Sequence, residues 1–197
     1  MMLQPVTLVC GFGRCGSSLV MQMLRAGGML VTGEWPGFED DRSGLTTFDS
    51  RWIAAQGGSA VKFLDPQVQV QDRLLARGSY RSIWLDRDLE QQALSVAKFH
   101  RTLLGIETSR RARRAIIASY QRDRPRALAI LRAHGPVIET RFEDLLLSPA
   151  TATRTLADFC SISHAKLPLM YLAILPRSPS AQRDLALEAH LIEAGPP

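Results

Sequence analysis

A glycine-rich segment near the N-terminus constrains the fold of this chain more than any other feature. It runs Cys10-Gly11-Phe12-Gly13-Arg14-Cys15-Gly16-Ser17-Ser18. The residues leading into it, Val6–Phe12, have the apolar character of a buried parallel strand, and Ser17–Ala26 have the pattern of an amphipathic helix. A tight turn between such elements gathers backbone N–H groups and a helix N-terminus around one point. The segment therefore predicts a site for a phosphate or sulfate group.

The rest of the chain alternates predicted strands with predicted helices. Further strands are expected at Met29–Thr32, Ala60–Leu64, Arg81–Asp86 and Val137–Thr140. Helices are expected at Pro66–Arg77, Asp88–Leu104, Arg110–Tyr120, Pro125–Ala133, Ser148–Cys160 and Ser180–Glu193. Repeated strand–helix units predict an α/β fold, in which a parallel sheet is covered on both faces and the site lies at the carboxyl ends of the strands.

Length and composition favour a single cytoplasmic domain that spans residues 1–197. Residues 33–58 form a long loop that is expected to be functional, and residues 161–197 carry only a weak pattern. No window approaches the ~20 apolar residues that span a bilayer, so we expect no membrane span. The sequence leaves the oligomeric state open.

The charged residues and the cysteines narrow the class of partner. The net charge is +5, and arginines cluster between Arg110 and Arg126, either as a solvated helical face or as a rim that attracts an anionic cofactor or substrate. No aromatic residues interleave with these arginines, so nucleic acid is not an expected partner. The three cysteines and four histidines lack metal-ligand spacing, so no metal is expected. A lowered thiol pKa at Cys15, in the anion loop, is one hypothesis.

Two familiar classes of nucleotide site fit the glycine-rich segment incompletely. Gly11, Gly13 and Gly16 match G-x-G-x-x-G of dinucleotide binding, and Glu34 follows the second strand where a ribose-binding acid belongs. Arg14, however, puts a full charge into a loop that normally binds with neutral backbone. The kinase or NTPase interpretation has an acid-terminated strand ending in Asp86, but Ser17 stands where the P-loop lysine belongs.

A third interpretation rests on a resemblance. The order Gly13-Arg14-Cys15-Gly16-Ser17-Ser18 resembles the 5′-phosphosulfate loop of the sulfotransferases that use 3′-phosphoadenosine 5′-phosphosulfate (PAPS), with Gly13 in place of proline and Cys15 in place of serine. The resemblance implies a P-loop NTPase-like three-layer sandwich of about five parallel strands flanked by helices. It also implies that these six residues bind the co-substrate PAPS without a metal.

Two further segments match the same family. Arg87 follows a strand and Ser95 stands eight positions later, about two helical turns on, as in the 3′-phosphate site of the family. An arginine fork and a hydroxyl suit a phosphomonoester. The segment Thr140-Arg141-Phe142-Glu143-Asp144-Leu145 looks like a family element before a proline and a helix, and Glu143 or Asp144 is expected to hold arginines in place. The resemblance covers roughly residues 5–160.

The resemblance implies in-line transfer of a sulfuryl group from PAPS to a hydroxyl or amine on a small-molecule or glycan acceptor. Arg14 takes the role of the loop cation of the family, and Lys62 matches a strand-three lysine, which contacts the sulfuryl group or pairs with an acid. Leu64 stands where many members have a histidine base. Glu34 is then the first choice for the general base and Asp65 the second, while Glu39 lies in the same loop as Glu34.

Two alternatives stay open at this stage. One is a nucleotide-binding protein of the P-loop kinase or NTPase type, and the other is a non-catalytic binding protein with a sulfotransferase-like fold. Loss of the strand-three histidine fits the second alternative, whereas the intact set Arg14, Arg87 and Ser95 opposes it. The aromatic residues of the long loop either form an acceptor pocket or anchor the loop to the core: Trp35, Phe38, Phe48 and Trp52.

Overall fold

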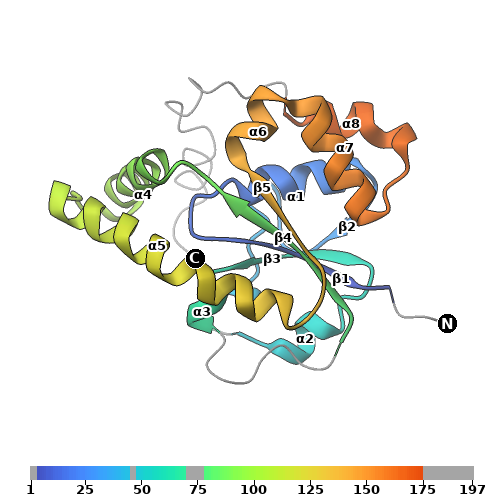
Figure 1. Ribbon diagram of the computed structural model, residues 1–197, viewed down its shortest axis with the longest axis horizontal. Coiled ribbons are helices and arrows are strands. Elements are labelled where there is room, and N and C mark those ends of the chain that lie inside the picture. The colour runs from blue at the N-terminus through green and yellow to red at the C-terminus, as the bar shows by residue number, and fades with distance from the viewer. Residues whose placement is uncertain (1–3, 45–47, 70–77, 175–197) are drawn as a thin grey trace.

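Five parallel strands form the centre of the molecule (Figure 1). The structure is a computed structural model that describes residues 4–44, 48–69 and 78–174. The strands lie side by side in the order β2-β3-β1-β4-β5. Their bounds are β1 Val6–Gly11, β2 Leu30–Val31, β3 Ser59–Leu64, β4 Tyr80–Asp86 and β5 Val137–Arg141. The α/β fold with a five-stranded parallel sheet is therefore confirmed.

Helices cover both faces of the sheet, as the three-layer prediction requires (Figure 1). One face is covered by α1 (Ser17–Ala26), α6 (Phe142–Leu147), α7 (Pro149–Cys160) and α8 (Leu167–Leu172). The other face is covered by α2 (Ser50–Ala54), α3 (Pro66–Gln69) and α5 (Arg110–Arg132). The remaining helices are α4 (Leu89–Leu104) and the short 3-10 helices η1 (Asp41–Ser43) and η2 (His164–Lys166).

The alternation of side chains along β1 produces these two cores. Val9 is buried among residues of α1, α7 and α8, whereas Leu8 and Cys10 are buried on the opposite face with Leu128 of α5. Because neighbouring residues of a strand point to opposite faces, a strand that is apolar throughout can only lie between two helical layers. The central strand therefore fixes the sandwich. Within the described residues, no helix is both long and apolar enough to cross a membrane.

The structure corrects the prediction of two short helices between residues 110 and 133. They form one helix, α5, with Pro125 inside it. Proline removes one backbone hydrogen bond and normally ends or kinks a helix, so the sequence predicted a break. Side chains on both sides of Pro125 hold the helix in place, because Tyr120 stacks on Phe12 and Leu128 is buried in the core. Tertiary packing thus overrides the local preference.

The other differences are smaller. The long loop contains η1 and α2, and the element before Ser148 forms α6, none of which was predicted. The helix expected at Pro66–Arg77 is described only as α3, and its remaining residues lie outside the described part of the chain, as does the helix expected at Ser180–Glu193.

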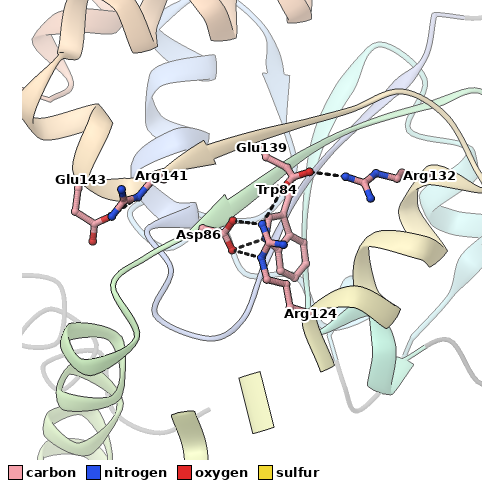
Figure 2. A network of polar contacts seen from close by, with 7 residues as sticks. All are labelled: Trp84, Asp86, Arg124, Arg132, Glu139, Arg141 and Glu143. Carbon is pink, nitrogen blue, oxygen red and sulfur yellow. Dashed lines mark hydrogen bonds and ion pairs between the residues drawn. The ribbon is translucent and has the colours of Figure 1, made fainter. Parts of the chain in front are cut away.

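A network of ion pairs connects α5 to the carboxyl end of β4 and to the middle of β5 (Figure 2). Arg124 donates from Nε to Asp86 Oδ1 at 2.9 Å, and its Nη2 pairs with Glu139 Oε2 at 2.6 Å. Trp84 Nε1 also donates to Asp86 Oδ1, at 2.8 Å, and Arg132 pairs with Glu139. Burial acts to raise the pKa of Asp86, but the hydrogen bonds from Arg124 and Trp84 outweigh it and leave the pKa lowered. Arg124 therefore stabilises the end of the strand that leads to Arg87.

Replacing Arg124 by alanine is expected to lower the free energy of unfolding at pH 7 by about 1–2 kcal/mol, because it leaves Asp86 and Glu139 without their shared partner. Since the pKa of Asp86 is lowered in the folded state, its contribution is present above its unfolded pKa of ~3.9 and is lost as the pH falls through the folded value. The difference between wild type and variant should therefore shrink below about pH 4. Urea unfolding at both pH values measures it.

Arg122→Ala is the matched control for this prediction. Arg122 is two residues away on the same helix and pairs only with the adjacent Asp123 among the described residues. Because this arginine is exposed, its loss is expected to leave the unfolding free energy nearly unchanged. Equal losses for both variants would contradict a special role for the Arg124 network.

Candidate functional site

The glycine-rich segment forms the connection between β1 and α1, at the carboxyl edge of the sheet (Figure 1). The connection is tight, because the Cys15 N–H donates to the Phe12 carbonyl at 3.1 Å. A side chain at Gly11 would place its Cβ 2.6 Å from Cys15 Sγ and 2.8 Å from the Leu85 carbonyl oxygen. Glycine at position 11 thus lets the loop fold back against the neighbouring strand.

Gly16 is the N-cap residue of α1, and two constraints require glycine at this position. Its φ is 102°, which side chains disfavour, and a Cβ would lie 2.3 Å from the Phe142 ring. No side chain of the described residues caps α1, and its first turn contains no acidic residue. The helix begins at Ser17, so its N-terminal N–H groups and positive dipole end face the loop. Such an end favours an external anion.

Lys62 lies on the β3 side of this loop. Its side chain is only 4% exposed, and its ammonium donates to Ser18 Oγ at 3.0 Å and to the Gly37 carbonyl at 3.0 Å. It also pairs with the Glu39 carboxylate. The Glu39 side chain is 69% exposed, so this ion pair connects a buried cation to the solvent side of the loop. The structure thus brings a lysine, a hydroxyl and a carboxylate together beside the start of α1.

The long loop is built so that Glu39 reaches this position. Phe38 is fully buried and its N–H donates to the Glu34 carbonyl at 2.6 Å, which closes a turn. Gly33 allows the turn, because a Cβ there would lie 2.5 Å from the Phe38 backbone. Gln22 of α1 donates to the Pro36 carbonyl at 3.0 Å. These contacts anchor the loop to α1 and to the core, and Glu39 follows directly after the buried Phe38.

Arg14, Arg87 and Ser95 meet on the β4 side of the loop. Arg14 Nε donates to Ser95 Oγ at 3.2 Å, and Arg87 Nη1 donates to the Arg14 carbonyl at 3.0 Å. The Arg14 guanidinium lies over the Phe99 ring at 5.2 Å from its centroid. The spacing of Arg87 and Ser95 in the sequence therefore corresponds to proximity in the structure, with the loop cation between them.

Arg87 is held against α6. Its guanidinium lies 4.7 Å from the centroid of the Phe142 ring, the same ring that packs on Gly16. Burial lowers the pKa of Arg87, and the charge of Glu143 acts in the opposite direction. The Arg87 Nε atom is buried and has no hydrogen-bond partner among the described residues. A cation with an unused buried donor is suited to an anionic ligand.

Phe142 and Gln92 are site residues that the sequence analysis did not select. Phe142 contacts both Gly16 and Arg87, whereas Glu143 of the same motif accepts a hydrogen bond from the Asp88 N–H at 2.9 Å. Gln92 is 2% exposed and donates to the carbonyls of Phe12 and Gly13 at 3.2 and 2.9 Å. The sequence did contain a signal for Gln92, because a polar residue on the buried face of a predicted helix needs a hydrogen-bond partner.

The two carboxylates that the sequence favoured as bases have different surroundings. Glu34 is exposed, and its side chain forms no hydrogen bond or ion pair with any residue that the structure describes. Asp65 adopts a left-handed φ of 52° and accepts from Gln67 Nε2 at 3.5 Å. Burial raises the pKa of Asp65, opposed by hydrogen bonds from Gln67 and from the Gly13 N–H. Asp65 therefore supports the loop, and Glu39 is the carboxylate that contacts Lys62.

The hypothesis of a reactive Cys15 is wrong. Burial raises the pKa of the Cys15 thiol to about 11, although hydrogen bonds from Ser17 and the charge of Lys62 act in the opposite direction. The thiol is fully buried and stays protonated near neutral pH. Its side chain belongs to the buried core and its N–H donates to the Phe12 carbonyl, so Cys15 supports the shape of the loop.

The aromatic residues of the long loop divide into anchors and one exposed ring. Phe38 is fully buried and Phe48 stacks on Phe63 of β3. Trp52 lies under the Arg42 guanidinium, 4.1 Å from it. Trp35 is 59% exposed. The site also has a cavity of about 160 Å³. Arg87 and Gln92 line it, together with Phe12, Leu85, Leu89, Tyr120 and others.

Comparison with known proteins gives matches in structure and none in sequence. No protein-family model matches the chain, and no curated protein matches it. Among solved structures, retinol dehydratase in complex with retinol and PAP has a TM-score of 0.53 at 14% identity, over 90% of this chain and 66% of that one. Retinol dehydratase with androsterone and the inactive cofactor PAP gives 0.50 at 12% identity, over 88% and 65%.

A third match is the sulfotransferase domain from the curacin biosynthetic pathway, with a TM-score of 0.53 at 14% identity over 87% of this chain and 79% of that domain. The chain spans about two thirds of the length of the retinol dehydratase chains that it matches. Its five-stranded parallel sheet flanked by helices is consistent with these matches. The chain therefore has the fold of these solved structures, which include a sulfotransferase domain.

Proposed function

We propose that this protein is a sulfotransferase that moves a sulfuryl group from PAPS to a hydroxyl or amine of a small-molecule or glycan acceptor by in-line displacement. One observation carries the proposal: cations paired with hydroxyls flank the two sides of an uncapped helix N-terminus. Lys62 with Ser18 lies on one side, and Arg14 with Ser95 lies on the other.

The residues fit the two anionic ends of such a co-substrate. At the loop, the backbone N–H groups of residues 16–18 and the hydroxyls of Ser17 and Ser18 surround the N-terminus of α1. At the β4 side, Arg87 keeps a buried, unused Nε donor beside Ser95 and Arg14. PAPS would supply an activated sulfuryl group on its 5′-phosphate and would be held at its 3′-phosphate by Arg87 and Ser95.

Glu39 is the residue that we propose as proton acceptor, ahead of Glu34 and Asp65. Its carboxylate already meets Lys62 beside Ser18, whereas Glu34 points to solvent and Asp65 is engaged with Gln67 and the loop backbone. A general base must lie within hydrogen-bond reach of the acceptor proton, so position decides first. Lys62 would orient the transferred group and balance the charge of Glu39.

The kinase or NTPase alternative is less well supported by the site. In that class the acid at the end of a strand beside the phosphate loop serves the metal. Here that acid, Asp86, is engaged by Arg124 and by Trp84 Nε1. Glu34 does not support the dinucleotide alternative, because its exposed side chain forms no hydrogen bond or ion pair with the described residues of the loop between β1 and α1.

Calorimetric titration with adenosine 3′,5′-bisphosphate is the direct test of the proposal, with ADP plus magnesium and NAD as comparison ligands. Selective binding of the bisphosphate is expected. Preference for ADP or NAD would mean that another nucleotide class occupies the loop. Binding of the bisphosphate without turnover of PAPS in an acceptor screen would favour the non-catalytic alternative.

Arg87→Ala is expected to weaken binding of adenosine 3′,5′-bisphosphate by about 10- to 100-fold, because it removes a charge-assisted, forked contact to the 3′-phosphate. Affinity for adenosine 5′-monophosphate, which lacks that phosphate, should change by less than about threefold. Calorimetry with both ligands measures the ratio. Similar losses for the two nucleotides would show that Arg87 supports the loop and does not read the 3′-phosphate.

A further inference from the structure

The connection between α4 and α5 carries a concentration of positive charge. We call residues 98–114 the basic tip; they contain five arginines and one lysine but a single acid, Glu107. The resulting excess of five positive charges equals the formal net charge of the whole chain, +5. The other residues are therefore balanced overall. In Figure 1, α4 and the first turns of α5 project away from the sheet at the left of the view.

The arginines of the basic tip are not neutralised by the part of the protein that the structure describes. Arg101, Arg110, Arg111, Arg113 and Arg114 form no ion pair with another described residue, and all but Arg113 are exposed. Later in the same helix, Arg122, Arg124 and Arg132 each pair with a carboxylate. Within the described residues, these three arginines of the second half of α5 thus form ion pairs inside the protein, whereas those of the first half do not.

The positions of these arginines destabilise the helix that carries them. α5 begins at Arg110 and has no acidic residue in its first turn, so its cations lie at the positive end of the helix dipole. Arg110 is three and four residues from Arg113 and Arg114, a spacing at which like charges repel. An anionic partner outside the chain would relieve both effects.

Two exposed aliphatic residues distinguish this surface from a general polyanion site. Leu104 and Ile106 are 58% and 53% exposed and flank Gly105, which ends α4 with a φ of 65°. The aromatic ring of the basic tip, Phe99, lies under the Arg14 guanidinium instead of offering a stacking surface. Aliphatic side chains beside arginines are typical of a segment that lies on a membrane, where apolar groups enter the headgroup region and cations meet anionic lipid.

We propose that the basic tip docks on an anionic lipid surface. The arginines supply the attraction, and Leu104 and Ile106 insert at the end of α4. Ser95 lies nine residues before Leu104 on the same helix, about 14 Å along its axis. Docking would therefore bring the edge of the candidate site close to the lipid headgroups. The inference does not depend on the proposed enzymatic function.

Co-sedimentation of the full chain with vesicles tests the docking. We expect binding to phosphatidylcholine vesicles that contain about 30% phosphatidylglycerol, and at least tenfold weaker binding to pure phosphatidylcholine. Raising the ionic strength from about 0.1 to 1 M shortens the screening length from ~10 to ~3 Å and should abolish binding. Equal binding to the two kinds of vesicle would overturn the proposal.

Variants assign the binding to the basic tip. Arg110→Ala combined with Arg111→Ala should weaken binding by about 25-fold, or about fivefold per arginine. Leu104→Asp combined with Ile106→Asp should also weaken it. Arg154→Ala and Leu147→Asp are the controls, since both residues are exposed on the α6–α7 side of the molecule. Unchanged binding of the tip variants would overturn the proposal.

The arginine variant also separates docking from folding. Because Arg110 and Arg111 oppose the dipole of α5, their loss should leave the melting temperature equal or raise it while binding falls. If the aspartate variant keeps its affinity for vesicles while single-stranded RNA displaces the protein from them, the tip is a nucleic-acid surface and the lipid proposal is wrong.

Discussion

Replacing Arg14 by alanine is expected to lower kcat for sulfuryl transfer by about 100- to 1,000-fold, the effect of removing one fixed donor from a site where charge develops. Arg14 is the cation of the loop itself, and its side chain and backbone contact Ser95 and Arg87 on the β4 side of the site. Affinity for adenosine 3′,5′-bisphosphate should fall much less than kcat. Steady-state kinetics with PAPS and calorimetry with the bisphosphate measure the two quantities on the same protein.

Two controls accompany this variant. Arg14→Lys keeps the charge but loses the planar fork, so it should recover part of kcat. Ser95→Ala removes the Arg14 partner on α4 and should weaken the bisphosphate more than it lowers kcat, since Ser95 is assigned to the 3′-phosphate. Position 14 has a left-handed φ of 67°, and arginine, lysine and alanine there would carry the same backbone strain. This strain therefore cancels when the position 14 variants are compared. A loss of affinity with kcat unchanged would assign Arg14 to binding alone.

Local patterns were sufficient to predict the sheet and the position of the loop. The apolar run of β1, the glycines after it and the amphipathic face of α1 are each encoded within about 20 residues, and neighbouring residues decide such features. The proximity of Arg87 and Ser95 was also predictable, because Arg87 directly follows β4 and Ser95 lies in the second turn of the next helix, α4.

Features that depend on distant contacts could not be predicted in the same way. Pro125 should end a helix by its local chemistry, but α5 continues through it. Tyr120 stacks on Phe12 and Leu128 is buried against β1, so tertiary packing holds both sides of the proline. The choice between Glu34 and Glu39 likewise depends on a turn that is held by distant contacts: Gln22 of α1 binds the Pro36 carbonyl, and Phe38 is buried in the core. Burial of Cys15 overrides the lowering of its pKa that the anion loop alone would predict.

The general base is the assignment on which structure and sequence pattern differ most, and a pair of conservative variants separates them. Glu39→Gln is expected to lower kcat by about 100- to 10,000-fold, because an amide cannot take the proton of the acceptor. The amide oxygen can still accept from Lys62, so the loop should keep its shape. Glu34→Gln, five residues earlier in the same loop, should leave kcat within about threefold of wild type.

The affinity of Glu39→Gln for adenosine 3′,5′-bisphosphate shows whether Glu39 acts as a base or only supports the structure of the loop. Glu39 neutralises Lys62 in the resting site, so Glu39→Gln leaves the Lys62 charge available to an incoming anion. Affinity for adenosine 3′,5′-bisphosphate should therefore stay equal or rise while turnover falls, and the acid limb of the pH profile of kcat should disappear. A fall in affinity together with turnover would mean that the Glu39–Lys62 pair only shapes the loop. Loss of turnover in Glu34→Gln and not in Glu39→Gln would return the role of base to Glu34.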